Sequence, residues 1–239
     1  MIWNGFHKEE FIFKKRKAVI VFPEKPNEAR NWMIKTEYFG AFPKLEIEML
    51  HRGWHLAYIE NKHRWCCDED LLLKKEFVDF LISKYNLSGK MVPIGMSCGG
   101  MFAVKYAALF PETVACLYLD APVMNLLSCP AGLGRAGNGM FDEYVNATNM
   151  TMSKLICYRE HPIDKIDILG SNRIPVIMVY GTDDNTVPYE ENGGILEEYY
   201  NRNHLIIKVI KKEHCGHHPH GLEDPTEIAA CIEKFTIYR

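Results

Sequence analysis

The decisive stretch of this chain is Met91-Val92-Pro93-Ile94-Gly95-Met96-Ser97-Cys98-Gly99-Gly100. Residues 91–94 are short and apolar, as in a buried strand, and residues 98–110 have the pattern of a helix that Pro111 ends. Between them lies the spacing Gly-x-Ser-x-Gly. A strand before this spacing and a helix after it are typical of a nucleophile elbow, a tight turn that exposes a serine hydroxyl.

The glycines on either side of Ser97 indicate which residue is the nucleophile. In such a turn the residues two before and two after the nucleophile come close to the strand and the helix, so only small side chains fit. Gly95 and Gly99 satisfy this for Ser97, whereas a nucleophilic Cys98 would place Met96 at a crowded position. We therefore expect Ser97 to be the nucleophile, with a glycine-rich turn without chemistry as the alternative.

Strand and helix patterns alternate on both sides of this turn. The order predicts an α/β protein with a mostly parallel central sheet and helices on both faces. The expected strands cover residues 11–13, 18–22, 54–59, 91–94, 114–119, 175–180 and 205–210, and the expected helices cover 37–52 (regular from Pro43), 68–82, 98–110, 190–202 and 224–235.

A serine hydroxyl needs a base that a third group orients, and behind an elbow the chain order is serine, acid, histidine. The turn Gly181-Thr182-Asp183-Asp184-Asn185-Thr186-Val187-Pro188 directly follows the strand expected at 175–180. Asp184, the third residue after the glycine, is the expected acid. Asp120, at the end of an earlier strand, and Asp183 remain alternatives.

The expected base lies in a histidine-rich loop between the last strand and the last helix, His214-Cys215-Gly216-His217-His218-Pro219-His220. The step Gly216-His217 favours His217, with His218 and His220 as alternatives. So many histidines also suggest a metal. Adjacent His217 and His218 would need a contorted loop to share one ion, however, and no Cys-x-x-Cys or acidic partner supplies a second arm. We expect no metal.

An oxyanion hole requires two N–H groups that point at the developing negative charge. The Cys98 N–H, at the start of the helix, is the first expected donor. The second is expected in the loop after the strand at 18–22. Because Pro23 has no N–H, Glu24 is the candidate there, with Lys25 as the alternative.

The length of 239 residues fits either one large domain or two small ones. Positions 97, 184 and 217 must meet at one sheet, so we expect a single domain over residues 1–239. Residues 121–174 interrupt the alternation and are too long for a simple connection. We expect them to form a cap inserted into this domain, where it would shape the pocket.

Charge and hydropathy exclude several classes of partner. The 28 Lys and Arg against 31 Asp and Glu give a net charge of −3, without general attraction to nucleic acid or anionic lipid. No run approaches the ~18 apolar residues of a membrane helix, and the N-terminus lacks the pattern of a signal peptide. The glycine-rich residues 132–137 do not lie between a strand and a helix, as a dinucleotide loop would. We expect a cytoplasmic protein that binds no nucleic acid, membrane or cofactor.

Further stretches accompany the elbow: Trp3-Asn4-Gly5-Phe6, Trp32, Glu37-Tyr38-Phe39-Gly40-Ala41-Phe42, Gly53-Trp54-His55, Glu191-Asn192 and Gly216-His217-His218-Pro219-His220-Gly221-Leu222-Glu223-Asp224-Pro225. With them the chain resembles the α/β-hydrolases over nearly its whole length. More narrowly, it is similar to a bacterial group associated with polysaccharide breakdown. That group tends to have Arg where this chain has Cys98, and Trp-x-Trp-Arg where it has Trp32-Met33-Ile34-Lys35.

The resemblance implies the α/β-hydrolase fold and ester hydrolysis, and acylated sugars as a substrate class. With the triad, it predicts a serine hydrolase that cleaves small carboxylic esters through an acyl-enzyme. A peptidase or amidase with the same triad and a non-catalytic ligand-binding protein are the alternatives. By position, the candidate substrate-binding residues are Trp32, Trp65, Phe141 and Asn192.

Overall fold

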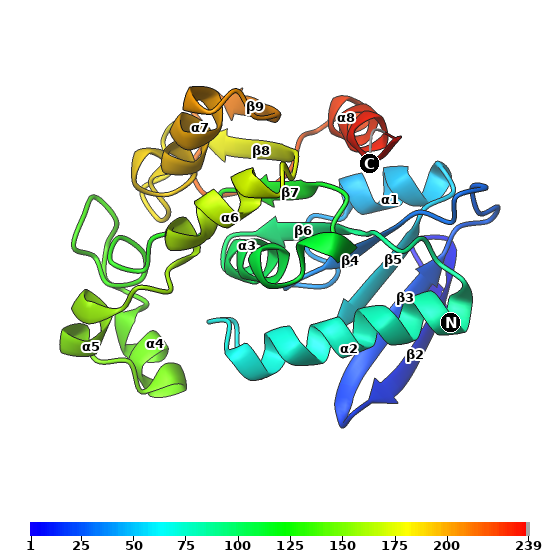
Figure 1. Ribbon diagram of the computed structural model, residues 1–239, viewed down its shortest axis with the longest axis horizontal. Coiled ribbons are helices and arrows are strands. Elements are labelled where there is room, and N and C mark those ends of the chain that lie inside the picture. Colours follow the sequence, from blue (N-terminus) through cyan, green and yellow to red (C-terminus); the bar gives the residue numbers. More distant parts are fainter. Residues whose placement is uncertain (238–239) are drawn as a thin grey trace.

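The computed structural model describes residues 1–237, which form one nine-stranded sheet with helices on both faces (Figure 1). The strand order is β1-β2-β3-β5-β4-β6-β7-β8-β9. The strands are β1 (Ile2–Trp3), β2 (Phe6–Phe13), β3 (Arg16–Phe22), β4 (Trp32–Lys35), β5 (His55–Ile59), β6 (Val92–Met96), β7 (Leu117–Asp120), β8 (Val176–Gly181) and β9 (Ile207–Lys212).

The centre of the sheet is parallel and one side of it is antiparallel. Every neighbouring pair from β5 through β4, β6, β7 and β8 to β9 is parallel, whereas β1, β2, β3 and β5 pair antiparallel. The mostly parallel sheet is thus confirmed. The carboxyl ends of parallel strands meet at one edge, so the residues that follow β6, β8 and β9 come together there.

Helices cover both faces because alternate strand residues supply two separate apolar cores. On one face α2, α3, α6 and α7 bury side chains such as Phe77 and Phe102. On the other, α1 and α8 bury Met49 and Ile232. No helix within residues 1–237 is long and apolar enough to span a bilayer. The helices are α1 (Lys44–His51), α2 (Asp68–Tyr85), α3 (Gly99–Leu109), α4 (Phe141–Thr148), α5 (Met152–Cys157), α6 (Ile166–Ser171), α7 (Gly193–Arg202) and α8 (Thr226–Ile237), with short 3₁₀ turns η1 (Pro111–Thr113), η2 (Pro162–Lys165) and η3 (Tyr189–Glu191).

The segment between β7 and β8, residues 121–174, leaves the sheet and returns to it. Figure 1 shows α4 and α5 at the lower left, away from the strands. Tyr144 of α4 and Leu155 of α5 belong to a third apolar cluster, which also holds Trp65 and Met101. By contrast, Leu169 of α6 joins the core beside the sheet. The excursion away from the sheet therefore ends before α6.

Strand β4 lies at the centre of the sheet but was not expected from the sequence. It inserts between β5 and β6, and all four of its residues are buried. Its last residue is Lys35, whose ammonium group pairs with the buried carboxylate of Glu46. A charged residue in so short a run hides the strand pattern, because a buried Lys is rare unless it is paired. The helix expected over residues 37–52 is regular from Lys44, close to the expected Pro43, whereas residues 37–43 form the loop after β4.

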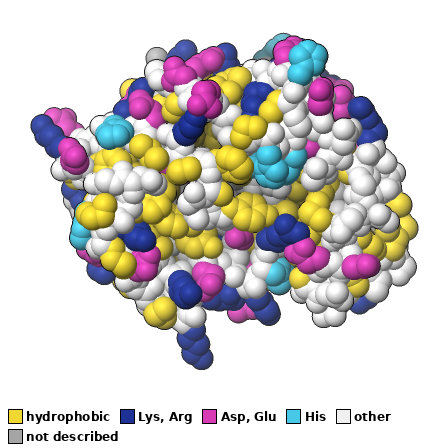
Figure 2. Space-filling view, turned by 180° about the vertical axis from the view of Figure 1, so that it is seen from behind, with side chains coloured by type: hydrophobic (Ala, Val, Ile, Leu, Met, Phe, Trp, Pro, Cys, Tyr) yellow, Lys and Arg dark blue, Asp and Glu magenta, His cyan; other side chains and the backbone are white. Residues whose placement is uncertain are grey.

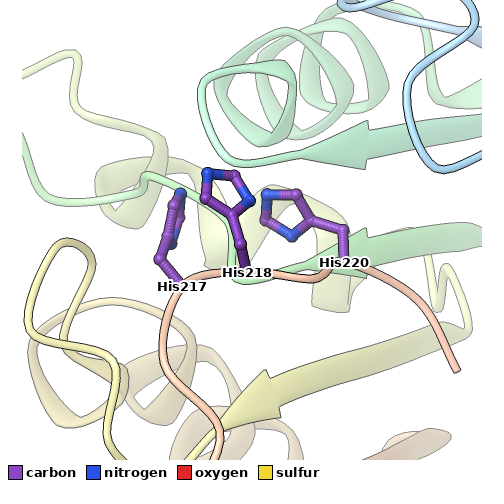
Figure 3. Close-up of side chains that lie close together, drawn as sticks. All are labelled: His217, His218 and His220. Atoms are coloured by element: carbon purple, nitrogen blue, oxygen red, sulfur yellow. The ribbon is translucent and has the colours of Figure 1, made fainter.

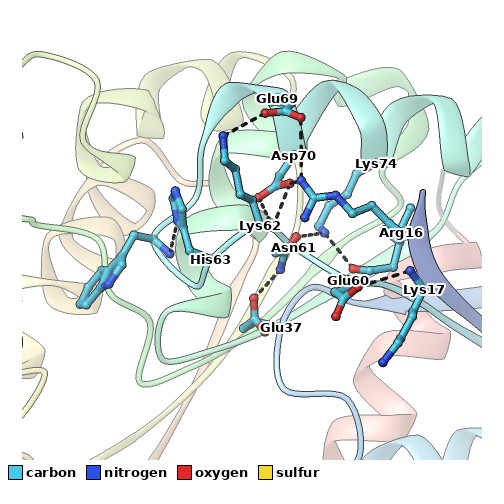
Figure 4. A network of polar contacts seen from close by, with 12 residues as sticks. Arg16, Lys17, Glu37, Glu60, Asn61, Lys62, His63, Glu69, Asp70 and Lys74 are labelled. Carbon is cyan, nitrogen blue, oxygen red and sulfur yellow. Dashed lines mark hydrogen bonds and ion pairs between the residues drawn. The ribbon is translucent and has the colours of Figure 1, made fainter. Parts of the chain in front are cut away.

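A polar network fixes the loop that follows β4 (Figure 4). The Asn61 side-chain amide donates to the Thr36 carbonyl oxygen at 2.8 Å and to the Glu37 carboxylate. The buried Lys74 ammonium donates in turn to the Asn61 amide oxygen. Asp70 accepts a hydrogen bond from the Lys62 N–H at 2.9 Å. The β5–α2 connection thereby holds residues 36 and 37 in place.

His55 is expected to make the stability of this protein depend on pH. Its imidazole is fully buried at the start of β5, next to Phe22. Burial, with the charge of Arg30, lowers the pKa of His55 from 6.5 to about 4. Between these two pH values the unfolded chain binds a proton at His55 and the folded chain does not. The contribution of neutral His55 to the free energy of unfolding is therefore complete above pH 6.5 and is lost as the pH falls toward 4. The loss should reach about 3 kcal/mol of unfolding free energy.

Urea unfolding between pH 7 and pH 4 tests this expectation. The His55→Leu variant should lose this part of the pH dependence. His7→Leu, which replaces an exposed histidine on β2, should keep it. Equal pH dependence in His55→Leu and the wild type would contradict the buried neutral imidazole.

Candidate active site

Ser97 occupies the tight turn between β6 and α3. Its φ is +51°, a left-handed conformation that is strained for a residue with a side chain. Its N–H donates to the Asp120 carbonyl oxygen at 2.9 Å. A Cβ on Gly95 would lie 2.8 Å from the Cβ of Ala103, so the turn leaves no room for a larger residue there. The serine hydroxyl is thereby presented at the carboxyl edge of the sheet.

Ser97, His217 and Asp184 form one continuous hydrogen-bonded chain. His217 Nε2 lies 2.9 Å from Ser97 Oγ, and His217 Nδ1 lies 2.8 Å from Asp184 Oδ2. His217 comes from the loop after β9, and Asp184 from the turn after β8. The structure brings together the three residues that the sequence predicts as nucleophile, base and acid. In this arrangement the imidazole can accept the serine proton while the carboxylate holds the ring.

The turn around Asp184 keeps its carboxylate ionised. Asp184 is buried, and its Oδ1 accepts hydrogen bonds from the N–H groups of Thr186 and Val187, each at 2.9 Å. Burial by itself raises the pKa of Asp184, but the hydrogen bonds from His217 and from these two N–H groups outweigh it. The net pKa lies below its usual value of 3.8. Asp184 can therefore stabilise a positive charge that forms on His217.

The alternative acids take other roles. The Asp120 carboxylate lies 2.6 Å from His220 Nδ1 and accepts the Gly221 N–H at 2.5 Å. It therefore anchors the histidine loop and faces a different imidazole. The exposed Asp183 carboxylate accepts the hydroxyl of Thr182 at 2.9 Å. Among the described contacts, only Asp184 is paired with the histidine that reaches Ser97.

The second oxyanion donor was predicted at Glu24, and the strand order shows that this placement is wrong. Glu24 is exposed in the loop after β3, and β5 and β4 separate β3 from the elbow strand β6. The missed strand β4 is the neighbour of β6, so its loop lies beside the elbow. Thr36 Oγ1 is 2.8 Å from the Gly99 carbonyl oxygen. The residues next in sequence, Glu37 and Tyr38, replace the loop of Glu24 at this edge.

Cys98 directly follows the nucleophile and caps the N-terminus of α3, so its N–H is placed at the elbow. Its side chain is buried. Burial raises the pKa of the Cys98 thiol, which keeps it protonated and weakly nucleophilic. The Cys98 residue thus offers a backbone donor rather than a reactive thiolate.

A pocket of about 340 Å³ opens beside Ser97. Apolar side chains form much of its wall, and Arg64 is its only Lys or Arg among the described residues. In the space-filling view, histidine side chains lie among hydrophobic ones near the middle of one face (Figure 2). The pocket is lined by Tyr38, Ala41, Phe42, Arg64, Met96, Ser97, Met140, Thr186, His217, His218 and His220.

None of the four predicted substrate-binding residues lines this pocket. Trp32 is fully buried in β4 and donates from its indole to the Ser88 carbonyl oxygen. Trp65 is buried and bonds to Glu143. Phe141 packs at the start of α4 against the third cluster. Asn192 is buried, and its Oδ1 accepts the N–H groups of residues 124 and 125. Their large or polar side chains serve packing and chain anchoring.

Sequence reasoning missed Tyr38 and Arg64, which do line the pocket. Tyr38 fell inside the helix expected from residue 37, although it belongs to a stretch that carried the family resemblance. Arg64 lies in the connection between β5 and α2. Its guanidinium makes a two-pronged contact with Glu143 of α4, with Nε 2.7 Å from Oε1. The hydrogen bond from Arg64 lowers the pKa of Glu143. Arg64 thus joins the pocket wall to the excursion.

The histidine loop also departs from expectation. Adjacent His217 and His218 are expected to need a contorted loop to share one ion, yet a nitrogen from each of them and from His220 lies within 4.8 Å of the others. Figure 3 shows the three rings projecting from the loop to the same side. The loop thus brings the three side chains together, and the expected absence of a metal stays a prediction.

Comparison with known proteins shows the fold. No protein-family profile matches the chain, and no curated protein matches its sequence. Three solved structures are similar in fold, and each matches 98% of this chain. They are an acylaminoacyl peptidase of Pyrococcus horikoshii (13% identity, TM-score 0.70), a puromycin-hydrolysing peptidase of Mycobacterium tuberculosis (12%, 0.71) and a candidate lipase of Acinetobacter baumannii (13%, 0.63).

The matched lengths differ between these three structures. The chain spans 40% and 39% of the two peptidases but 92% of the candidate lipase. With the strand order above, these likenesses show that the chain has the α/β-hydrolase fold.

Proposed function

We propose that this chain is a serine hydrolase that cleaves small carboxylic esters through an acyl-enzyme. The observation that carries the proposal is the unbroken hydrogen-bonded chain from Ser97 through His217 to Asp184 beside an open pocket. Each member has the partner that its role requires. A glycine-rich turn without a catalytic role would not need a serine, a histidine and an aspartate joined by hydrogen bonds.

The geometry supports a two-step reaction. His217 Nε2 accepts the Ser97 proton as Oγ attacks the acyl carbon, and Asp184 stabilises the resulting imidazolium. The tetrahedral intermediate places its negative oxygen toward the Cys98 N–H. His217 then gives the proton to the departing alcohol oxygen, which leaves Ser97 acylated. A water molecule then attacks the acyl carbon while His217 accepts a proton from that water. His217 returns the proton to Ser97 Oγ, which releases the carboxylic acid and restores the free serine.

The pocket favours a small ester. Its volume of about 340 Å³ is at the lower end for small-molecule sites. Ala41, Phe42 and Met140 suit a short acyl chain, while Arg64 offers a polar group to the alcohol part of the ester. A short-chain acyl ester of a sugar has both parts, and it is the class that the sequence resemblance implies.

Tyr38 is the proposed second oxyanion donor. It lines the pocket with Ser97, while its N–H already donates to the Glu37 carboxylate at 3.2 Å. The phenol O–H is the proposed donor, and burial raises the pKa of Tyr38 and keeps that O–H protonated. Tyr38→Phe should lower kcat by about 100-fold with little change in KM. Steady-state kinetics on a nitrophenyl ester would measure both. A raised KM at normal kcat would instead assign Tyr38 to substrate binding.

The proposed function is tested by covalent labelling and turnover together. The wild type should react with a fluorophosphonate at Ser97 and hydrolyse nitrophenyl acetate or butyrate faster than nitrophenyl esters of long acids. An acetylated sugar should also be deacetylated. Absence of both labelling and turnover would overturn the proposal and leave a non-catalytic binding protein.

Peptide or amide hydrolysis is a second candidate, favoured by the fold shared with the two peptidases. An aminopeptidase panel distinguishes the two reactions in the same preparation. Higher kcat/KM on aminoacyl nitroanilides than on esters of the same acyl group would replace the esterase assignment. The labelling of Ser97 would stand in either case.

A further inference from the structure

We propose that His217, His218 and His220 form a binding site for a Zn²⁺ ion that blocks the catalytic base. The three residues lie in the loop between β9 and α8, at the pocket beside Ser97. Each offers one ring nitrogen, and these nitrogens lie within 4.8 Å of one another. Imidazole is a preferred ligand of Zn²⁺, and three histidines with an open fourth position are a known donor set for it.

The spacing of the rings fits such an ion. Their centroids are 4.8 Å apart for His217 and His218, 4.9 Å for His217 and His220, and 4.9 Å for His218 and His220. Three imidazoles around a tetrahedral zinc, with Zn–N bonds of ~2.0–2.1 Å, have ring centres roughly 5 Å apart. The rings also stand steeply to one another, at 65°, 81° and 85°. The ring nitrogens, which lie within 4.8 Å of one another, would have to move closer together to bind one ion.

Two of the three histidines already have the outer partners that zinc ligands use. The Asp184 carboxylate lies 2.8 Å from His217 Nδ1, and the Asp120 carboxylate lies 2.6 Å from His220 Nδ1. Each carboxylate holds the proton on Nδ1 and leaves Nε2 as the ligand atom. A carboxylate on the far nitrogen orients a zinc-binding histidine and raises its affinity. The buried Asp120–His220 pair, which the triad does not use, gains a role in this way.

The exposed ring of His218 leaves the three-histidine group open to an ion from solvent. His220 is buried, His217 is half-buried and His218 is exposed. His218 stacks on Phe42, with ring centroids 5.5 Å apart. The ion would thus lie at the mouth of the pocket, where water can fill its remaining position.

Occupancy of this site would stop catalysis, and this consequence rests on the proposed function. His217 Nε2 is the atom that faces Ser97 Oγ at 2.9 Å. Its single lone pair cannot bind Zn²⁺ and accept the serine proton at once. Zinc therefore acts as a reversible inhibitor, and a chelator restores the free base.

Isothermal titration with Zn²⁺ at neutral pH tests the site without using activity. The wild type and the Ser97→Ala variant should each bind one ion with similar affinity. His218→Phe keeps the ring against Phe42 but removes the ligand, so its affinity should fall at least about tenfold. The matched control, His7→Phe on β2, should bind as the wild type does. No saturable binding, or equal affinity in His218→Phe, would overturn the site.

Inhibition of ester hydrolysis tests the consequence. Each variant is compared with its own metal-free rate. Zinc should inhibit the wild type at the concentration at which it binds, and at least about tenfold more should be needed for His218→Phe. Binding without inhibition of an active enzyme would overturn the block of the base. Binding to a protein that turns over no substrate would leave the site intact and refute the proposed function.

Discussion

Replacing Ser97 by alanine is expected to lower kcat by about a million-fold, the size of the loss when a triad serine is removed. Alanine has no oxygen to attack the acyl carbon, and no neighbour can substitute for it. The adjacent Cys98 thiol is buried, and burial raises its pKa, so it supplies no thiolate. The residual rate should come from the oxyanion donors and the binding of substrate alone.

Kinetics with a nitrophenyl ester measure this loss, and circular dichroism checks that the fold persists. Alanine should fit the turn, because it has the same Cβ and lacks only the Oγ that contacts His217. Fluorophosphonate labelling should disappear with the activity. Cys98→Ala is the matched control and should keep both labelling and most of the activity. Labelling that persists in Ser97→Ala and vanishes in Cys98→Ala would identify the thiol as the nucleophile.

Replacing Asp184 by asparagine is expected to lower kcat by about 10,000-fold with a small change in KM. The Asp184 Oδ2 oxygen accepts from His217 Nδ1, while Oδ1 accepts two backbone N–H groups. An asparagine that keeps its oxygen toward the backbone turns its NH₂ toward the imidazole. The ring then carries its proton on Nε2 and cannot accept one from Ser97.

Two matched variants separate Asp184 from the other candidate acids. Asp183→Asn changes the exposed neighbour and should leave kcat almost unaltered. Asp120→Asn disturbs the anchor at His220 and should cost far less than Asp184→Asn, because Asp120 does not contact His217 through any described bond. A larger loss in Asp120→Asn than in Asp184→Asn would transfer the role of acid to the end of β7.

Sequence patterns predict the sheet where strands are apolar and flanked by clear turns. β6 and β7 are buried along their length, and so is β8 except at Tyr180, so the apolar pattern alone could locate these strands. The same pattern could not locate β4, because its four residues end in Lys35 and show neither alternation nor a long apolar run. Its burial depends on Glu46, which comes from α1 and reaches Lys35 only in the folded chain.

The same distinction applies to the site. The positions of Ser97, Asp184 and His217 follow from steric and chemical rules local to each turn. Pocket residues obey no such local rule, since Arg64 is held at the pocket by contacts such as the one with Glu143 on the excursion, which is distant in sequence. Trp32 was predicted as a pocket residue because its strand was missed, and a large aromatic in a loop looks exposed. Without β4, the neighbour of the elbow was misassigned, and Glu24 was chosen in place of a residue from the loop after β4.

The parallel centre of the sheet bears on how fast this protein folds. β5, β4, β6, β7, β8 and β9 cannot pair through hairpins, and parallel neighbours need long crossover segments. The local pairs β1–β2 and β2–β3 lie at the edge farthest from the catalytic residues. Chains dominated by distant contacts fold slowly, because loop closure precedes the gain from packing. During refolding from urea, hydrolytic activity should therefore return after the first hairpins, once β8 and β9 have docked.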